Sequence, residues 1–154
     1  MIEPPQIVET TEKFTAALHL TVPRSEIRTA MGPGVSEMFA AVAAQGIEPI
    51  GPWFTHHLKR PDETFDFEIC VEVARPIEPA GRVRPSTWPA MKVARTVYHG
   101  DYEGLPDAWG EFMGWIEGQS LKTAADLWEV YVVNPHDTPS AADWRTQLNR
   151  PLVD

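Results

Sequence analysis

Cysteine is almost absent from this chain of 154 residues, since Cys70 is the only one. It has no partner for an internal disulfide, and no cysteine pair exists for a zinc site. Basic residues are also scarce: 13 Lys and Arg stand against 22 Asp and Glu, a net charge of −9. Both halves share this deficit, so no basic stripe offers the phosphate contacts on which nucleic-acid affinity depends. We expect no direct nucleic-acid binding, and an acidic surface favours cationic ligands.

Long apolar segments and catalytic signatures are missing as well. The longest apolar run, residues 38–44, is much shorter than the ~20 residues of a membrane span. The N-terminus lacks the basic and apolar regions of a signal peptide, so we expect a cytoplasmic protein with no membrane partner. No Walker loop, dinucleotide fingerprint or Gly-x-Ser-x-Gly elbow occurs, and no cofactor is expected.

The five histidines do not predict a metal site. His56 and His57 are adjacent in a predicted strand, so their side chains point to opposite faces and do not share one ion. The remaining three have no ligand spacing. We therefore expect no metal.

Proline divides the chain into two similar halves. Residues 1–154 have the length of one domain, with a first repeat at about 6–75 and a second at 90–154. The connector 76–89 holds four prolines, which exclude a helix or a central strand there.

Each repeat is predicted to contain a strand, a helix and two further strands. Both helices carry apolar residues at i, i+3, i+4 and i+7, the stripe of an amphipathic helix. In the first repeat this stripe follows Gly32 and ends at Gly46, and in the second it lies between Pro106 and Gly118. The predicted strands are residues 13–21, 52–58, 64–73, 90–99, 127–133 and 144–152. Matched positions lie about 74–75 residues apart, which is the sign of an internal duplication.

These elements predict an α+β fold of duplicated βαββ units. Two units side by side form one continuous antiparallel sheet, with two helices on one face and a ligand groove on the other. Small molecules bind in concave seams between repeats, so the groove is the expected site.

Three passages resemble the GyrI-like family, the effector-binding domain of AraC-type and BmrR-type regulators. They are residues 46–54 (GIEPIGPWF), residues 88–94 (WPAMKVA) with His99-Gly100-Asp101-Tyr102, and the closing residues 128–131 and 143–152. The resemblance implies the duplicated βαββ fold and a groove that binds hydrophobic, often cationic or aromatic compounds. Many members are attached to a helix-turn-helix region, and we expect none before residue 1 here. A homodimer stays an open expectation.

Glu129 is the leading candidate for the charged group of the groove. Period-two geometry puts Glu129 and Tyr131 on one strand face and the apolar Trp128, Val130 and Val132 on the other. With the apolar face placed against the helices, Glu129 and Tyr131 face the groove, where desolvation is expected to raise the Glu129 pKa. The resemblance also implies a glutamate anchor at this position. The alternative is a solvated strand glutamate.

The duplication extends the candidate site to aromatic residues of the first repeat. If Trp53 matches Trp128, then Phe54 matches Glu129 and His56 matches Tyr131, so Phe54 and His56 face the groove too. Trp53 and Phe54 would then stack on a flat ligand or hold a cation over a ring, unless they are core residues.

Other candidates stay open. Tyr102 either reaches the ligand, as the family's Gly-x-Tyr position implies, or anchors its loop. Trp115 lies off its helix stripe and is either a groove lid or an exposed indole. Glu68 and Glu72 either face the groove or are solvated.

Three functions are compatible with this sequence. The first is binding of small amphipathic, cationic or aromatic compounds, as in multidrug-binding domains. The second, suggested by stand-alone relatives, is a cyclopropanoid hydrolase that opens the ring of DNA-alkylating toxins, with Glu129 orienting water and Tyr131 or Tyr102 donating a proton. The third is docking on a larger protein such as DNA gyrase, implied by the family's name-giving member.

Overall fold

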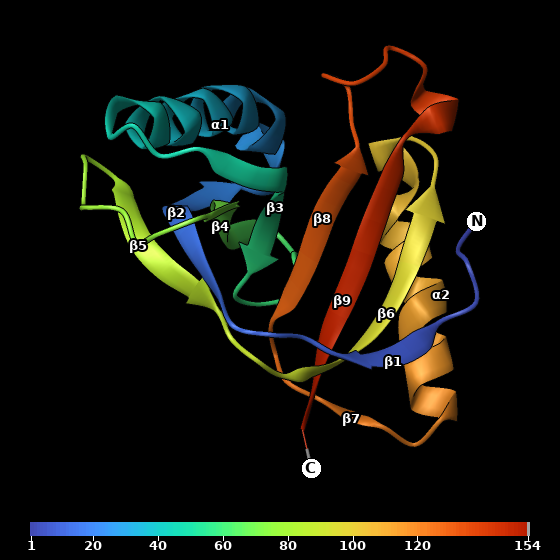
Figure 1. Cartoon of the computed structure of the whole chain (residues 1–154). Helices are drawn as coiled ribbons and strands as arrows, with labels where there is room; N and C mark the ends of the chain where they lie inside the picture. Colours follow the sequence, from blue (N-terminus) through green and yellow to red (C-terminus); the bar gives the residue numbers. More distant parts are fainter. Residues whose placement is uncertain (154) are drawn as a thin grey trace.

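Two similar units lie side by side in the computed structural model, which describes residues 1–153 (Figure 1). The elements of the first unit are β2 (Lys13–Pro23), α1 (Ile27–Ala44), β3 (Pro49–His57) and β4 (Thr64–Val73). Those of the second are β6 (Lys92–His99), α2 (Leu105–Gly118), β8 (Leu127–Val133) and β9 (Arg145–Val153). Three further strands are β1 (Gln6–Glu9), β5 (Val83–Trp88) and β7 (Lys122–Thr123). The predicted α+β fold of duplicated βαββ units is confirmed.

The two units join through β3 and β8 in one antiparallel sheet. The strand order is β1-β6-β9-β8-β3-β4-β2-β5, and β7 pairs with β9. At the junction Thr55 lies opposite Glu129, and these two residues are 74 positions apart. Because the repeat offset is also about 74, the pseudo-twofold axis passes through this pair.

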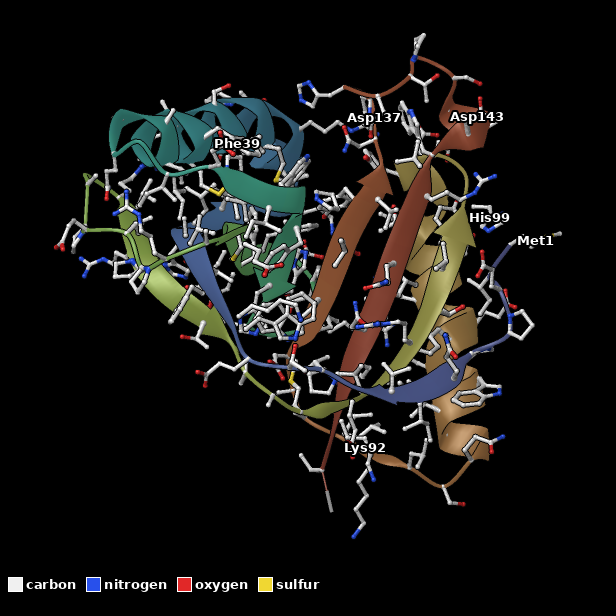
Figure 2. All side chains as sticks on the ribbon, in the orientation of Figure 1. Met1, Phe39, Lys92, His99, Asp137 and Asp143 are labelled. Carbon is white, nitrogen blue, oxygen red and sulfur yellow. The ribbon has the colours of Figure 1, made fainter. Side chains whose placement is uncertain are left out.

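Both helices pack on the same face of the sheet. Met38 and Val42 of α1 contact a buried cluster that includes Ile69, and Phe112 of α2 contacts one that includes Leu148. Phe39, labelled on α1 in Figure 2, packs against the first cluster. Ile69 pairs with Thr55, and Leu148 pairs with Glu129, so all four strand residues point toward the helices.

The opposite face of the sheet is also partly buried. Phe54, Trp88 and Trp128 form a third cluster there with Ala17 and Cys70. Trp88 is the last residue of β5, which pairs with β2 at the edge of the sheet, and its ring stacks on Trp128 at 4.3 Å. The centre of the sheet therefore has packed side chains on both faces.

Several strand ends differ from the sequence prediction by one to three residues, and three larger differences concern α1, the connector and two short strands. Helix α1 begins at Ile27 rather than near Gly32 and contains Pro33, because burial of its apolar stripe outweighs one missing backbone hydrogen bond. The connector contains β5, whose Pro85 is tolerated because β5 is an edge strand. Strands β1 and β7 are short and were not predicted. Within residues 1–153, no helix is long and apolar enough to cross a membrane.

Candidate functional site

Glu129 is buried at the junction between the two repeats. Its residue exposure is 7%. The indole Nε1 of Trp109, on α2, donates a hydrogen bond of 2.6 Å to Oε2, and the Tyr131 hydroxyl donates one of 2.8 Å to Oε1. The His57 Nε2 atom lies 3.7 Å from Oε1, a distance for charge interaction rather than a hydrogen bond. Both repeats thus supply polar groups to one buried carboxylate.

Thr55 connects these groups from β3. Its Oγ1 atom lies 2.8 Å from the Tyr131 hydroxyl and 3.1 Å from His57 Nε2. Thr55 and His57 alternate along β3 as Glu129 and Tyr131 do along β8, so the four side chains share one face. The result is a continuous polar network on the pseudo-twofold axis.

Glu129 is ionised at neutral pH. Burial raises the pKa of this carboxyl, but the neighbouring His57 and the hydrogen bonds from Trp109 and Tyr131 lower it more, so the net pKa lies below its ordinary value. The expected rise in the Glu129 pKa is therefore wrong. The physical reason is that two hydrogen-bond donors and the nearby His57 face a group for which the sequence indicated only desolvation.

Aromatic rings cover the carboxylate. The Trp53 ring lies 4.2 Å from the Tyr131 ring between centroids, and Tyr102 packs edge-on against Tyr131 at 5.7 Å. Trp144 stacks on Tyr102 at 5.0 Å. Tyr131 itself is buried, whereas Trp53, Tyr102 and Trp144 are half-buried. These three rings are the outer layer of the site.

Acidic residues lie beyond this layer. Figure 2 places Asp137 and Asp143 on the connection between β8 and β9. Burial, together with the charges of Glu129 and Asp137, raises the pKa of Tyr102 to about 12. The Tyr102 hydroxyl is consequently a neutral hydrogen-bond donor at any physiological pH, and its surroundings repel anions.

Three polar atoms in this cluster are buried without a hydrogen-bond partner among the described residues. They are Trp53 Nε1, Tyr102 Oη and His57 Nδ1. An unsatisfied buried polar group costs about 1–3 kcal/mol, and native proteins contain few of them. Further unpartnered atoms among the described residues are Thr146 Oγ1 and, in the far-face cluster, Nε1 of Trp88 and of Trp128.

The sequence placed Glu129 and Tyr131 on the wrong face of the sheet. They lie under the helices, while Trp128 and Val130 lie on the opposite face with Trp88. The apolar residues of β8 did not have to face the helices, because Trp88 of β5 packs against Trp128 on the other face of the sheet. The residues that surround Glu129 in the structure therefore differ from those that the sequence predicted.

Phe54 and His56 do not join Glu129. In the register of β3 and β8, Phe54 pairs with Val130 and His56 with Trp128, so both point away from the helices. The prediction used an offset of 75 instead of 74, and a shift of one residue moves every side chain to the other face. Of the first-repeat candidates, Trp53 alone contacts the site, through Tyr131.

His56 has its own surroundings on the far face. Its ring stacks on Trp128 at 3.7 Å, and its nitrogens lie 2.7 Å from Asp126 Oδ2 and 3.2 Å from Glu68 Oε1. Burial lowers the pKa of His56, but the two carboxylates raise it more, and the net pKa is above its ordinary value. The predicted separation of His56 and His57 on opposite faces is confirmed.

The remaining candidates lie away from Glu129. Trp115 packs against the α2 cluster and lines an open groove beside Ile2 and Glu111. Glu68 contacts His56, and Glu72 lines a cleft on the far face. Within residues 1–153, no group of three His, Cys, Asp or Glu side chains is arranged to hold a metal ion.

Sequence reasoning missed four residues of the site: Thr55, His57, Trp109 and Trp144. An offset of 74 would have placed Thr55 opposite Glu129 and His57 beside it. Trp109 belongs to the apolar stripe of its helix, and that pattern does not show that its indole N–H meets a carboxylate. Trp144 was noted only within a motif of the resemblance.

Solved structures with the same fold include regulators and ligand-bound proteins. The chain is similar to the crystal structure of the EcmrR C-terminal domain, with a TM-score of 0.86, 19% identity and coverage of 98% of both chains. In the cryo-EM structure of an EcmrR–DNA complex the match has a TM-score of 0.85 and 21% identity, and it covers 97% of this chain but 57% of the EcmrR chain.

Two more distant structures share the fold. One is SAV2435 bound to tetraphenylphosphonium, with a TM-score of 0.65, 10% identity and coverage of 98% of this chain and 94% of that one. The other is a hydrolase from Listeria innocua, with a TM-score of 0.66, 10% identity and coverage of 97% and 91%. Comparison with curated protein sequences gives no match.

The sequence profile of the GyrI-like small molecule binding domain matches residues 3–149. This range includes the first repeat, the connector, the second repeat up to residue 149 and every residue around Glu129. The suggested resemblance is confirmed: the chain belongs to the GyrI-like small-molecule-binding family.

Proposed function

We propose that the Glu129 site binds an aromatic organic cation. The observation that carries this proposal is the pairing of a buried, ionised carboxylate with half-buried aromatic rings. Glu129 supplies the charge, and Trp53, Tyr102 and Tyr131 supply flat surfaces next to it. A cation is attracted both to a carboxylate in surroundings of low dielectric constant and to the negative face of an aromatic ring.

The hydrogen bonds to Glu129 support a binding role more than a role as general base. A carboxyl with a lowered pKa is a weak base, but it holds its negative charge at all physiological pH values. Its two oxygens accept up to about four hydrogen bonds, and Trp109 and Tyr131 occupy two of these positions. The remaining acceptor positions on the Glu129 carboxylate are therefore available to a ligand.

The outer rings must move to admit a ligand. Trp53, Tyr102 and Trp144 pack over the carboxylate, and these side chains have partial exposure. A ligand that separates them would also reach the unpartnered Trp53 Nε1 and Tyr102 Oη atoms. A polar group on the ligand would satisfy these donors, so both its charge and its hydrogen-bonding groups favour binding.

The test compares tetraphenylphosphonium with the neutral triphenylphosphine oxide by isothermal titration calorimetry and tryptophan fluorescence. In Glu129→Gln the amide keeps the shape of the side chain but removes its charge. Affinity for the cation should fall by about 1–3 kcal/mol, or roughly five- to 150-fold, because a charge interaction in a desolvated site is lost. Affinity for the neutral oxide should change little.

Glu117→Gln is the matched control, since Glu117 is an exposed glutamate of α2. It removes the same net charge from the protein without touching the site, so cation affinity should be unchanged. Equal loss in both variants would mean that general surface charge is responsible. Unchanged affinity in Glu129→Gln would refute the proposed role of the carboxylate.

A hydrolase is the second candidate, favoured by the neutral, buried Tyr102 hydroxyl close to Glu129. Glu129 would orient a water molecule and Tyr102 would donate a proton to the oxygen that gains charge when a strained ring opens. One of the structures with this fold is a hydrolase, which makes the chemistry compatible with the scaffold. Mass spectrometry of a cyclopropane-bearing alkylator distinguishes the two functions. Many turnovers, each adding one water molecule to the alkylator, indicate an enzyme, and the absence of turnover indicates a binder.

A further inference from the structure

A second cleft lies on the face of the sheet opposite the helices. It has a volume of about 230 Å³. Phe54 of β3 and Val130 of β8 form part of its lining, and Trp88 of β5 forms another part. Phe54 and Trp88 pack edge-on at 5.0 Å between ring centroids and form part of the apolar lining. Glu129 does not line it, because Glu129 lies on the helix side of the same strand.

The cleft results from an irregularity in β3. Pairing with β4 shifts register between Ile50 and Phe54, and pairing with β8 ends at Phe54. Gly51 has a φ of +73°, which glycine adopts freely, and Pro52 has no N–H to offer a neighbouring strand. Ile50, Gly51 and Pro52 line the cleft as a consequence of this bulge. Bulges re-aim side chains in this way next to binding sites.

Two cations and one anion line the cleft in a protein whose net charge is −9. The cations are Lys13 and Arg95, and the anion is Glu72. Lys13 Nζ lies 5.8 Å from the centre of the Trp88 ring. The lining therefore carries a net positive charge next to aromatic rings, opposite to the charge of the Glu129 site.

Arg95 is the group that the fold leaves incomplete. Its side chain is half-buried, and its Nε atom donates a hydrogen bond of 2.6 Å to Asn149 Oδ1. Within residues 1–153, no carboxylate lies within 4.0 Å of this guanidinium. Burial lowers the pKa of Arg95, since no acid offsets the desolvation. A guanidinium fork matches a carboxylate in two parallel hydrogen bonds.

We propose that this cleft is a second ligand site and that it takes a small planar aromatic monocarboxylate. The carboxylate would accept hydrogen bonds from Arg95 and interact with Lys13, and the ring would lie against Trp88 and Phe54. Glu72, the acid in the lining, disfavours a second negative charge on the ligand. The site therefore selects monoanions over both dianions and cations.

The probe for this proposal is 2-naphthoate, compared with the neutral 2-naphthamide and the dianion naphthalene-2,6-dicarboxylate by isothermal titration calorimetry. We expect one molecule of 2-naphthoate per chain and weaker binding of the other two. Arg95→Gln should lower 2-naphthoate affinity by roughly tenfold or more, the usual effect of losing a charge-assisted hydrogen bond. Arg75→Gln, at an exposed arginine next to the connector, is the control and should leave affinity unchanged.

The two sites are distinguished in the same experiment. Saturating tetraphenylphosphonium should not displace 2-naphthoate, and Arg95→Gln should not alter tetraphenylphosphonium binding. Displacement, equal affinity for 2-naphthamide, equal loss in the two arginine variants, or no binding of 2-naphthoate at millimolar concentration would each overturn the proposal. If Arg95→Gln does not fold, as judged by circular dichroism, Lys13→Gln replaces it, and an unchanged affinity in that variant would overturn the proposal as well.

Discussion

Trp109→Phe tests whether the indole of α2 stabilises the Glu129 carboxylate. The substitution keeps an aromatic ring but removes the donor of the 2.6 Å hydrogen bond. A hydrogen bond to a charged group contributes about 1.5–3 kcal/mol, whereas one to a neutral group contributes about 0.5–1.5 kcal/mol. Phenylalanine also leaves a small cavity in the α2 cluster, and a comparison within a mutant cycle removes that contribution.

The cycle combines Trp109→Phe with Glu129→Gln. In Glu129→Gln the amide oxygen still accepts from the indole, and the amide NH₂ group can donate to the Tyr131 hydroxyl, which then donates to Thr55. The network remains satisfied without charge. Trp109→Phe should therefore destabilise the parent by about 1–1.5 kcal/mol more than it destabilises Glu129→Gln. Urea unfolding at pH 7 measures this coupling free energy.

Lowering the pH is an independent test of the hydrogen bond between Trp109 and Glu129. A carboxyl whose folded-state pKa is lowered contributes stability above its unfolded pKa and loses it as the pH falls through the folded value. The coupling should therefore disappear once Glu129 is protonated. Trp144→Phe, which removes a 2.9 Å hydrogen bond to the neutral Thr138 carbonyl, is the control and should show no such pH dependence. Equal costs of Trp109→Phe in both backgrounds would refute the argument.

Two further predictions concern the far face and the β3 bulge. The raised pKa of His56 contributes stability that is complete below its unfolded pKa of about 6.5 and is lost as the pH rises through the folded value. Asp126→Asn should cost about 1 kcal/mol near pH 6 and flatten this decline in urea unfolding between pH 5.5 and 8.5; an identical pH profile would argue against the ion pair. Gly51→Ala should destabilise by about 1–2 kcal/mol in calorimetry because its φ is +73°, while Gly110→Ala, in open space on α2, should stabilise slightly. A neutral Gly51→Ala would mean that the bulge relaxes.

Local patterns determined most of the secondary structure. The predicted strands 64–73 and 127–133 match β4 and β8 to the residue, and Pro106 and Gly118 lie at the two ends of α2. These signals depend only on side-chain period and on the backbone preferences of proline and glycine. The offset between repeats also predicted the paired units, because a duplicated sequence folds into a duplicated structure.

Tertiary structure decided which face of the sheet holds the site. Alternation along β8 separates Glu129 and Tyr131 from Trp128 and Val130, but it does not show which pair lies under the helices when both faces are buried. Trp88, which is far from β8 in sequence, packs against Trp128 on the far face, so that face is buried as well. The partners of Glu129 come from α2 and β3, and the pairing of β3 with β8 fixes Thr55 as the residue opposite it. Such long-range contacts set the charge of the carboxylate, and no local pattern contains them.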